Sequence, residues 1–198
     1  MYNVDEVIQA ISIALIVPGF FLNFKRFLKS IELCKECLFI LKQQAGIKDD
    51  KFTNTFYVTI YFTMWKACSL ISDNTNAVKY AKTVAKLTSK LSEMYFHEKN
   101  YALTKDLLER ALLISKEIVD NSAEACSYLS LGGMYGSLGE YGKAREQLEK
   151  SLAIEKEIGD RSVEASSHKN LGVVYSKIGE YKKAKEQLKK ITCDEERN

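Results

Sequence analysis

The stretch SLGEYGKA, at residues 137–144, returns forty residues later as KIGEYKKA, at residues 177–184. In both copies glycine, glutamate and tyrosine stand in a row, and Lys and Ala follow shortly after them. Glycine accepts the left-handed conformation that ends many helices, and the Lys-Ala pair begins a new helix-forming run. The stretch therefore predicts a tight turn that joins two helices.

The forty-residue interval extends well beyond this turn. Identical residues recur at helical spacing in both copies: Leu131 and Leu171, Gly132 and Gly172, Tyr135 and Tyr175, Ala144 and Ala184, Leu148 and Leu188. The small residues suit places where two helices approach closely, and the large ones fill the space around them. A single helix pair cannot bury both of its faces, whereas stacked pairs form a superhelix with a concave surface. The period therefore predicts an all-α chain of stacked antiparallel helix pairs.

The residues of the first copy stand in a recognisable order: Tyr128, Leu131, Gly132, Tyr135, Ala144 and Leu148. This order resembles the tetratricopeptide (TPR) pattern W-x-x-L-G-x-x-Y…A-x-x-x-F, with tyrosine in the tryptophan place. The second copy has His168 in that place. The long period and the connector at residues 159–165 are similar to the TPRs of animal G-protein-signalling modulators of the LGN type and of invertebrate TPR arrays. The resemblance implies an α-α superhelix, the TPR solenoid.

The interval also predicts how the chain is organised. We expect one TPR-like helical array over residues 1–198, with diverged helix pairs over 1–75, a degenerate repeat with a fused long helix over 76–120, and TPR repeats over 121–160 and 161–198. In the connector, Gly159 can end one helix and Asp160 or Ser162 can cap the next. Lys99 stands where the degenerate repeat should have its turn glycine, so we expect that helix end to be capped differently.

In the first part of the degenerate repeat, the forty-residue interval is not kept. Tyr95 follows Tyr80 by only fifteen residues, which leaves no room for a loop. Because no Gly or Pro interrupts this segment, the sequence predicts one continuous helix from about Asn76 to His97. Aromatic and apolar residues predict a further helix over about 51–71, and two more are expected on either side of Pro18.

The longest apolar run, at residues 11–22, contains Pro18 and Gly19 and is too short to span a bilayer. Asp5 and Glu6 precede it, and no Lys or Arg does, which is the wrong charge for a signal peptide. We therefore expect a buried helix there.

Composition narrows the class of protein. The chain is 46% hydrophobic and 28% charged, as a folded domain requires, and its net charge of +3 gives no basic face for nucleic acid. The five cysteines are odd in number and scattered, unlike the dense framework of a secreted scaffold. These features predict a protein of the reducing cytoplasm that contacts neither nucleic acid nor membrane.

The residues that could carry chemistry all have structural explanations. Cys34 and Cys37 lie within a helical apolar pattern, and neither a second Cys pair nor a nearby histidine completes a zinc site. His97 ends a predicted helix, where a cation is favoured, and His168 takes the large-residue place of the repeat. No catalytic grouping is evident. The sequence therefore predicts a protein that is not an enzyme and has no metal or cofactor.

The TPR resemblance implies that the first helix of each pair lines a concave groove. The expected partner-binding residues of this groove are Lys86, Lys90, Leu129, Ser130, Gly133, Ser166, Lys169, Asn170, Val173 and Lys177. Asn170 matches an asparagine that in many TPRs hydrogen-bonds the backbone of an extended peptide. Its counterparts, Ser130 and Lys90, leave the row incomplete, and Asn170 has an equally good explanation as a solvated helix residue or as one that bonds a neighbouring repeat.

Two functions remain open. The first is a non-catalytic adaptor that binds a protein or peptide partner in the groove, where the lysines favour an acidic or C-terminal segment. The second is a structural, oligomerising or sensing array, a fragment of a larger signalling protein, that acts through its stacking ends. Self-association would then use apolar residues of the C-terminal repeat: Leu171, Val174, Ile178, Leu188 and Ile191. The sequence names neither the partner nor the oligomeric state.

Overall fold

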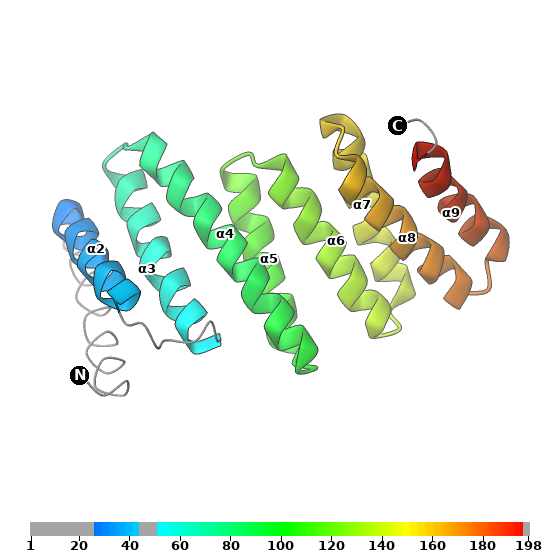
Figure 1. The fold of residues 1–198 in the computed structure, drawn as a ribbon, viewed down its shortest axis with the longest axis horizontal. Helices are drawn as coiled ribbons and strands as arrows, with labels where there is room; N and C mark the ends of the chain where they lie inside the picture. The colour runs from blue at the N-terminus through cyan, green and yellow to red at the C-terminus, as the bar shows by residue number, and fades with distance from the viewer. Residues whose placement is uncertain (1–25, 44–50, 196–198) are drawn as a thin grey trace. The chain divides into compact units, whose positions relative to one another are not determined.

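The computed structural model describes residues 26–43 and 51–195, and this part of the chain folds into eight α-helices with no strand (Figure 1). The all-α prediction is therefore confirmed. The chain divides into two compact units, Met1–Leu91 and Ser92–Asn198. The apolar run at residues 11–22 and the helices expected around Pro18 lie outside the described residues. Within the described ranges, no helix combines the length and the apolar character needed to cross a bilayer.

The first unit contains α2 (Phe27–Gln43), α3 (Lys51–Leu70) and the first part of α4 (Asn74–His97). The helix expected over about 51–71 is present as α3. The core of this unit lies between α2 and α3, which contact each other, and consists of Cys34, Cys37, Leu38, Leu41, Ile60 and Met64. The apolar pattern that predicted a helix around Cys34 therefore also supplies the buried face of that helix.

Helix α4 runs without interruption from Asn74 to His97, so the prediction of one continuous helix in this segment is confirmed. Asp73 caps its first turn, because the Asp73 carboxylate accepts from the backbone N–H and the side-chain amide of Asn76. The helix ends just before Lys99, whose φ is 60°.

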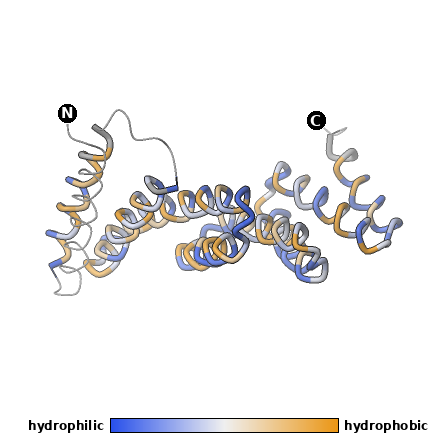
Figure 2. Tube along the Cα trace, turned by 90° about the horizontal axis from the view of Figure 1, so that it is seen from below, coloured by the Kyte–Doolittle hydropathy of each residue, from blue (hydrophilic) through white to orange (hydrophobic). Residues whose placement is uncertain are grey.

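The second unit adds five helices to the end of α4: α5 (Tyr101–Glu117), α6 (Asn121–Ser137), α7 (Tyr141–Ile158), α8 (Arg161–Lys177) and α9 (Tyr181–Glu195). Each of these five helices contacts the next along the chain, and α6 also contacts α8. Hydrophobic residues recur along each helix between hydrophilic ones (Figure 2), as expected for helices that bury one face. The result is the stacked helix pairs that the period predicts.

The turns between these helices repeat one design. Gly139 and Gly179 take the left-handed conformation after α6 and α8, with φ values of 76° and 83°. Asp120 and Asp160 cap α6 and α8, each accepting from the backbone N–H three residues on. The sequence offered Asp160 or Ser162 as the N-cap of α8, and Asp160 is the N-cap residue.

The helix end at Lys99 was expected to be capped differently from those at the turn glycines, and this expectation is wrong. Its backbone N–H donates to the Phe96 carbonyl and Asn100 N–H to the Tyr95 carbonyl, the same pattern that Gly139 and Glu140 make one repeat later. The helix end at Lys99 is thus capped in the same way as at the glycine, not differently. Lys99 adopts the left-handed conformation itself, because two hydrogen bonds and the packing on either side hold the turn.

The glycines of the motif allow the two helices of a pair to approach closely. A Cβ atom built on Gly132 would lie 2.5 Å from Leu148 Cγ, and one built on Gly172 would lie 3.2 Å from Leu188 Cγ. Leu148 is fully buried in an apolar cluster that joins α7, α8 and α9: Ala144, Leu148, Leu152, Leu171, Val174, Tyr175 and Ala184. Glycine is therefore required at position 132, where α6 crosses α7, and the contact at Gly172 is looser.

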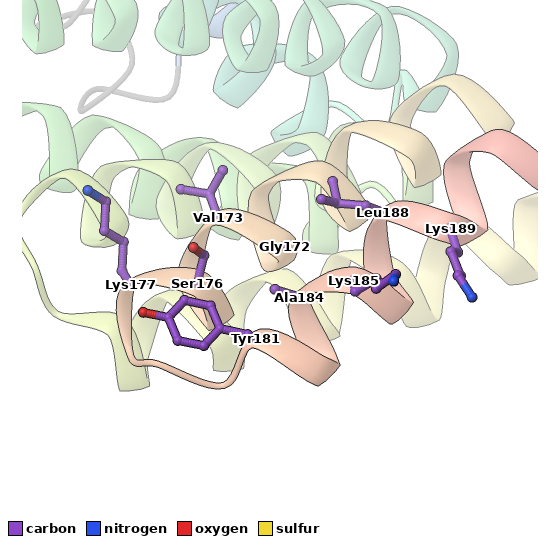
Figure 3. A pocket seen from close by; sticks show the side chains of 9 residues that line it. All are labelled: Gly172, Val173, Ser176, Lys177, Tyr181, Ala184, Lys185, Leu188 and Lys189. Atoms are coloured by element: carbon purple, nitrogen blue, oxygen red, sulfur yellow. The ribbon is translucent and has the colours of Figure 1, made fainter.

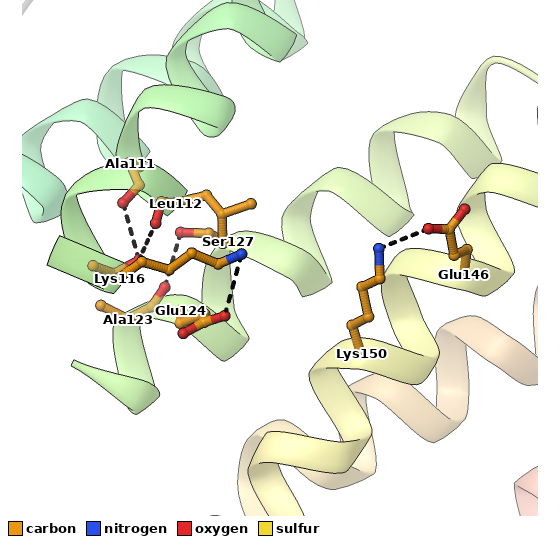
Figure 4. A network of polar contacts seen from close by, with 9 residues as sticks. Ala111, Leu112, Lys116, Ala123, Glu124, Ser127, Glu146 and Lys150 are labelled. Atoms are coloured by element: carbon orange, nitrogen blue, oxygen red, sulfur yellow. Dashed lines mark hydrogen bonds and ion pairs between the residues drawn. The ribbon is translucent and has the colours of Figure 1, made fainter. Parts of the chain in front are cut away.

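Tyr128 occupies the tryptophan place of the pattern, and two lysines lie against its ring. Lys116 of α5 and Lys150 of α7 hold their Nζ atoms 5.3 and 5.7 Å from the ring centroid. The same lysines form ion pairs with Glu124 and Glu146, and the Lys116 pair joins α5 to α6 (Figure 4). The tyrosine thus keeps the packing role of the large residue and adds contacts with cations.

A buried polar chain joins α6, α7 and α8. Ser151 Oγ lies 2.7 Å from the Ala125 carbonyl oxygen and 2.6 Å from Glu155 Oε1, and Ser167 Oγ donates to the same Oε1. Glu155 is fully buried, and burial raises the pKa of its carboxyl, an effect that the nearby Glu164 and Asp160 reinforce. The Ser151 hydroxyl has a single hydrogen and lies within hydrogen-bond distance of two acceptor oxygens, so it can donate fully to only one of them at a time.

Candidate interaction surface

The predicted partner-binding residues lie on exposed or half-buried helix faces. Leu129, Gly133 and Asn170 are half-buried, and the remaining members of the set are exposed: Lys86, Lys90, Ser130, Ser166, Lys169, Val173 and Lys177. Lys86 and Lys90 belong to the part of α4 in the first unit, and the others belong to α6 and α8 of the second. Leu129 packs against the apolar cluster of α7 and α8, so its side chain contributes to the core as well as to the surface.

The first helices of successive pairs, α6 and α8, meet through glycine. A Cβ atom on Gly133 would lie 4.0 Å from Asn170 Nδ2, and one on Gly136 would lie 3.9 Å from Val174 Cγ2. Because Gly133 has no side chain, nothing from its position covers the Asn170 amide. The structure therefore brings two of the predicted residues, Gly133 and Asn170, side by side.

A hollow of about 190 Å³ lies among the end of α4, α5 and α6, and we name it the α4–α6 hollow. Apolar side chains line it, namely Phe96, Leu108 and Met134, and the last two of these are almost fully buried. Its polar lining comes from all three helices: Ser92, Glu93, His97, Thr104 and Ser130. Gly133 also lines the hollow. One small apolar side chain of a ligand, surrounded by hydrogen-bonding groups, would suit this site.

A larger hollow of about 590 Å³ lies between α8 and α9, and we name it the terminal hollow. Figure 3 shows the side chains that both helices contribute to it. Its lining includes Val173 and Lys177 of the predicted set. Four of the ten predicted residues therefore line these two hollows: Ser130 and Gly133 line the first, and Val173 and Lys177 line the second.

Some lining residues were not predicted as site residues. Phe96, Thr104 and Met134 line the α4–α6 hollow, and Lys185 and Lys189 line the terminal hollow. The forty-residue period places Phe96 at the position of Gly136, which lies on the same helix face as the predicted groove residue Gly133, three residues before it. This spacing is a signal that Phe96 lies on the groove side of its helix. The lysines of α9 lack such a signal, because the second helix of a pair ordinarily faces outward in the pattern.

The C-terminal residues expected to support self-association are not equally available. Leu171 and Val174 are buried, with exposed fractions of 2% and 3%, because they pack against Ala144 and Leu148 of the same chain. This part of the expectation is therefore corrected: these two residues stabilise the pairing of α7 with α8. Leu188 remains half exposed.

Cys34, Cys37 and His168 are placed as structural residues. Cys34 and Cys37 are buried free thiols, and burial raises the pKa of Cys34 to about 12, which opposes formation of the reactive thiolate. His168 is buried, with Nδ1 2.7 Å from Gln187 Oε1 of α9. In the part of the chain that the structure describes, no group of three or more His, Cys, Asp and Glu side chains could hold a metal ion.

Several solved structures share this architecture. BtubC (BKLC) from P. vanneervenii aligns with a TM-score of 0.55 at 17% identity, over 94% of this chain and 80% of that protein. A Podosopora anserina protein described as kinesin light chain nearly identical TPR-like repeats aligns with a TM-score of 0.50 at 15% identity, over 96% and 98%. Aspartyl phosphate phosphatase F from Bacillus subtilis aligns with a TM-score of 0.52 at 12% identity, over 96% and 64%. At these identities the likeness shows the fold alone.

The sequence matches no curated protein, but it does match a family model that agrees with the fold. The family model described as tetratricopeptide repeat matches residues 83–157 and 124–192, which together make up more than half of the sequence. TPR proteins are typically non-catalytic scaffolds for protein interaction, and the stacked pairs, turn glycines and close helix crossings of α5 to α9 are those of such repeats. The chain therefore belongs to the tetratricopeptide repeat family.

Proposed function

We propose that this chain is a non-catalytic adaptor that binds an extended peptide segment of a partner protein across α6 and α8. The observation that carries the proposal is the position of Gly133, which both lines the α4–α6 hollow and lies next to Asn170. A peptide that crosses Gly133 could place one side chain in the hollow and one backbone amide against Asn170.

The α4–α6 hollow supports an apolar anchor. Its volume of about 190 Å³ suits a single side chain, and the buried Leu108 and Met134 give it an apolar lining. Exposed Ser130 and His97 stand at the same site and can hydrogen-bond the peptide on either side of the anchor. An apolar side chain among fixed polar groups is a common arrangement in small binding sites.

Asn170 supports recognition of the peptide backbone. Its amide both donates and accepts, as a peptide group requires, and its half-buried position restricts the side chain before the ligand binds. Lys169, the adjacent residue, is exposed and can attract an acidic side chain or a C-terminal carboxylate. The proposed ligand is therefore an extended peptide with one apolar anchor and a nearby negative charge.

The test begins with selection of binders from a library of random peptides displayed on phage, with the unaltered chain as bait. Affinities of the selected peptides are then measured by fluorescence anisotropy with the Asn170→Ala and Lys169→Glu variants. We expect each variant to weaken binding by about tenfold, because each removes an interaction of about 1.4 kcal/mol. Lys182→Glu, an exposed lysine of α9 outside both hollows, is the matched control for the charge reversal.

The selected sequences provide the second readout. An apolar residue at a constant distance from an acidic residue is the expected consensus. Ser130→Trp places a bulky ring at the α4–α6 hollow and should abolish binding without loss of helical content by circular dichroism. Binding that survives both Asn170→Ala and Ser130→Trp would contradict the proposal.

The alternative function, an array that acts through its stacking ends, has support of its own in the exposed lining of the terminal hollow. The resemblance to long-period TPRs of the LGN type is compatible with either function. A cytoplasmic location remains part of the proposal and rests on the scattered free cysteines.

A further inference from the structure

We propose that Glu155 makes the junction of α6, α7 and α8 a proton-dependent joint, which is closed while the buried carboxyl carries a proton and opens when the carboxyl ionises. The joint does not depend on the peptide-binding function. It rests on three observations: the position of Glu155 at the connector between α7 and α8, the contacts of its two carboxyl oxygens, and the residue that the preceding repeat has in its place.

Glu155 lies where α7 ends and the chain turns into α8. Its backbone carbonyl accepts from the N–H groups of Gly159, at 2.8 Å, and of Asp160, at 3.2 Å. Gly159 has the left-handed conformation, with a φ of 73°, and Asp160 is the N-cap of α8. The backbone of Glu155 thus holds the turn from which α8 begins, while its side chain lies between the helices that the turn connects.

The Glu155 side chain is fully buried and contacts two hydroxyls through one oxygen. Its Oε1 atom lies 2.6 Å from Ser151 Oγ of α7 and 3.0 Å from Ser167 Oγ of α8. Ser151 Oγ also lies 2.7 Å from the Ala125 carbonyl oxygen of α6. Among the residues that the structure describes, none forms a hydrogen bond with the buried Oε2 atom. An ionised carboxylate is poorly solvated in such a site, so the closed junction favours the neutral acid.

The acidic groups around Glu155 act in the same direction. Burial raises the pKa of its carboxyl most strongly, and the two serine hydroxyls oppose this effect. Glu164 of α8 and Asp160 of the connector raise the pKa further. Glu164 Oε1 in turn lies 3.7 Å from Nε2 of His168, and Cys126 of α6 is close enough to interact with the Glu155 carboxyl. Ionisation of Glu155 therefore places a further negative charge beside two others.

The preceding repeat has no carboxyl at this position. Ser115 stands forty residues before Glu155, and Ala111 stands forty residues before Ser151. Ser115 is fully buried, and its hydroxyl donates within its own helix, with Oγ 3.0 Å from the Ala111 carbonyl oxygen. Helices α5 and α6 thus stack with a neutral residue at this place. Packing of a helix pair does not require a carboxyl here, so Glu155 adds a dependence on protons that the preceding junction lacks.

The sign of the effect follows from proton linkage. Because the closed joint binds the proton more tightly than the open joint, a rise in pH favours opening. The ratio of open to closed joints should increase by up to about tenfold per pH unit above the ordinary carboxyl value of 4.5, until Glu155 ionises in the closed joint as well. Opening moves α8 from α6 and thus Asn170 from Gly133, which lie side by side when the joint is closed. Release of a peptide bound there is the one consequence that rests on the proposed function.

Hydrogen exchange of the full chain, followed by mass spectrometry of peptic fragments, measures the joint without any peptide ligand, so its outcome is separate from that of the peptide-binding test. Exchange is recorded from the ordinary carboxyl pKa upward and corrected for the intrinsic pH dependence of amide exchange. The chain is tested unaltered, as Glu155→Gln, and as the Ser151→Ala, Glu155→Ser double variant, which has the residues of the preceding repeat. Glu157→Gln, at an exposed carboxyl of the same helix, is the matched control.

In the unaltered chain and in Glu157→Gln, the protection of α8 should fall by up to about tenfold per pH unit, while α5 keeps its protection. In Glu155→Gln and in the double variant, the protection of α8 should depend much less on pH. The same pH dependence in the unaltered chain and in both Glu155 variants would overturn the proposal. A loss of protection that spreads equally over α5 to α9 would also overturn it, because the whole unit would then open rather than the joint.

Discussion

The glycines at the helix crossings provide a matched pair of substitutions. Gly132 and Gly172 hold the same place in consecutive repeats, and both lie inside a helix, so replacement by alanine gains the same intrinsic helix propensity of about 1 kcal/mol. What differs is the leucine that the new methyl group meets. The structure therefore predicts opposite effects on stability from the same chemical change.

At Gly132 the new Cβ would lie 2.5 Å from Leu148 Cγ and 2.7 Å from Cδ2, well inside the ordinary contact distance of about 3.5–4.0 Å. Leu148 is fully buried, so it cannot turn away without displacing its neighbours. Overpacking of this kind costs about 3 kcal/mol at the upper end of its usual range. After the gain in helix propensity, Gly132→Ala is expected to lower the free energy of unfolding by about 2 kcal/mol.

At Gly172 the nearest atoms are 3.1 and 3.2 Å away, and they belong to Leu188, which is 47% exposed at the open terminal hollow. Leu188 can shift by a few tenths of an ångström toward solvent. Gly172→Ala is therefore expected to raise the free energy of unfolding by about 0.5 kcal/mol. The two variants should differ by about 2–3 kcal/mol.

Urea unfolding followed by far-ultraviolet circular dichroism measures both variants, and an unchanged m-value confirms that the same transition is compared. Leu148→Ala provides the control, because in that background the new methyl group has room and Gly132→Ala should no longer destabilise. Equal shifts for the two glycine variants, or a Gly132→Ala variant as stable as the unaltered chain, would refute the reasoning.

Further substitutions test the buried carboxyl and the left-handed turns. Because burial raises the pKa of Glu155, the folded chain binds a proton more tightly than the unfolded chain, so stability should fall as pH rises above the ordinary carboxyl value of 4.5. Glu155→Gln should weaken that dependence and leave the chain at least as stable at neutral pH, and urea titrations at a series of pH values measure it; identical pH profiles would contradict the assignment. Val119 has a φ of 54° where the next repeat has Gly159, so Val119→Gly should stabilise by about 0.5–1 kcal/mol in thermal unfolding. Lys99→Gly should stabilise by a few tenths of a kcal/mol for the same reason, and Gly139→Ala, at the corresponding position one repeat later, should do the reverse.

The sequence by itself determined the repeat. The forty-residue period, the turn glycines and the spacing of apolar residues are local signals, and they predicted helix pairs from Tyr101 to the C-terminal repeat and the uninterrupted α4. Helix formation depends on neighbours within one or two turns, so a one-dimensional pattern contains that information. The same pattern misjudged Lys99, because the hydrogen bonds of a turn and its packing can hold a residue that local preference disfavours.

Only the tertiary structure decided which exposed residues come together. Ser130 and Gly133 join Phe96 and Thr104 in one hollow because α4, α5 and α6 converge there. Leu148 and Leu188 hold the same position in consecutive repeats, yet Leu148 is buried and Leu188 lines the terminal hollow. Burial of a side chain depends on whether another helix covers that face. The position of a side chain on its helix follows from sequence spacing, whereas its neighbours follow from how whole helices stack, and binding surfaces are made by those neighbours.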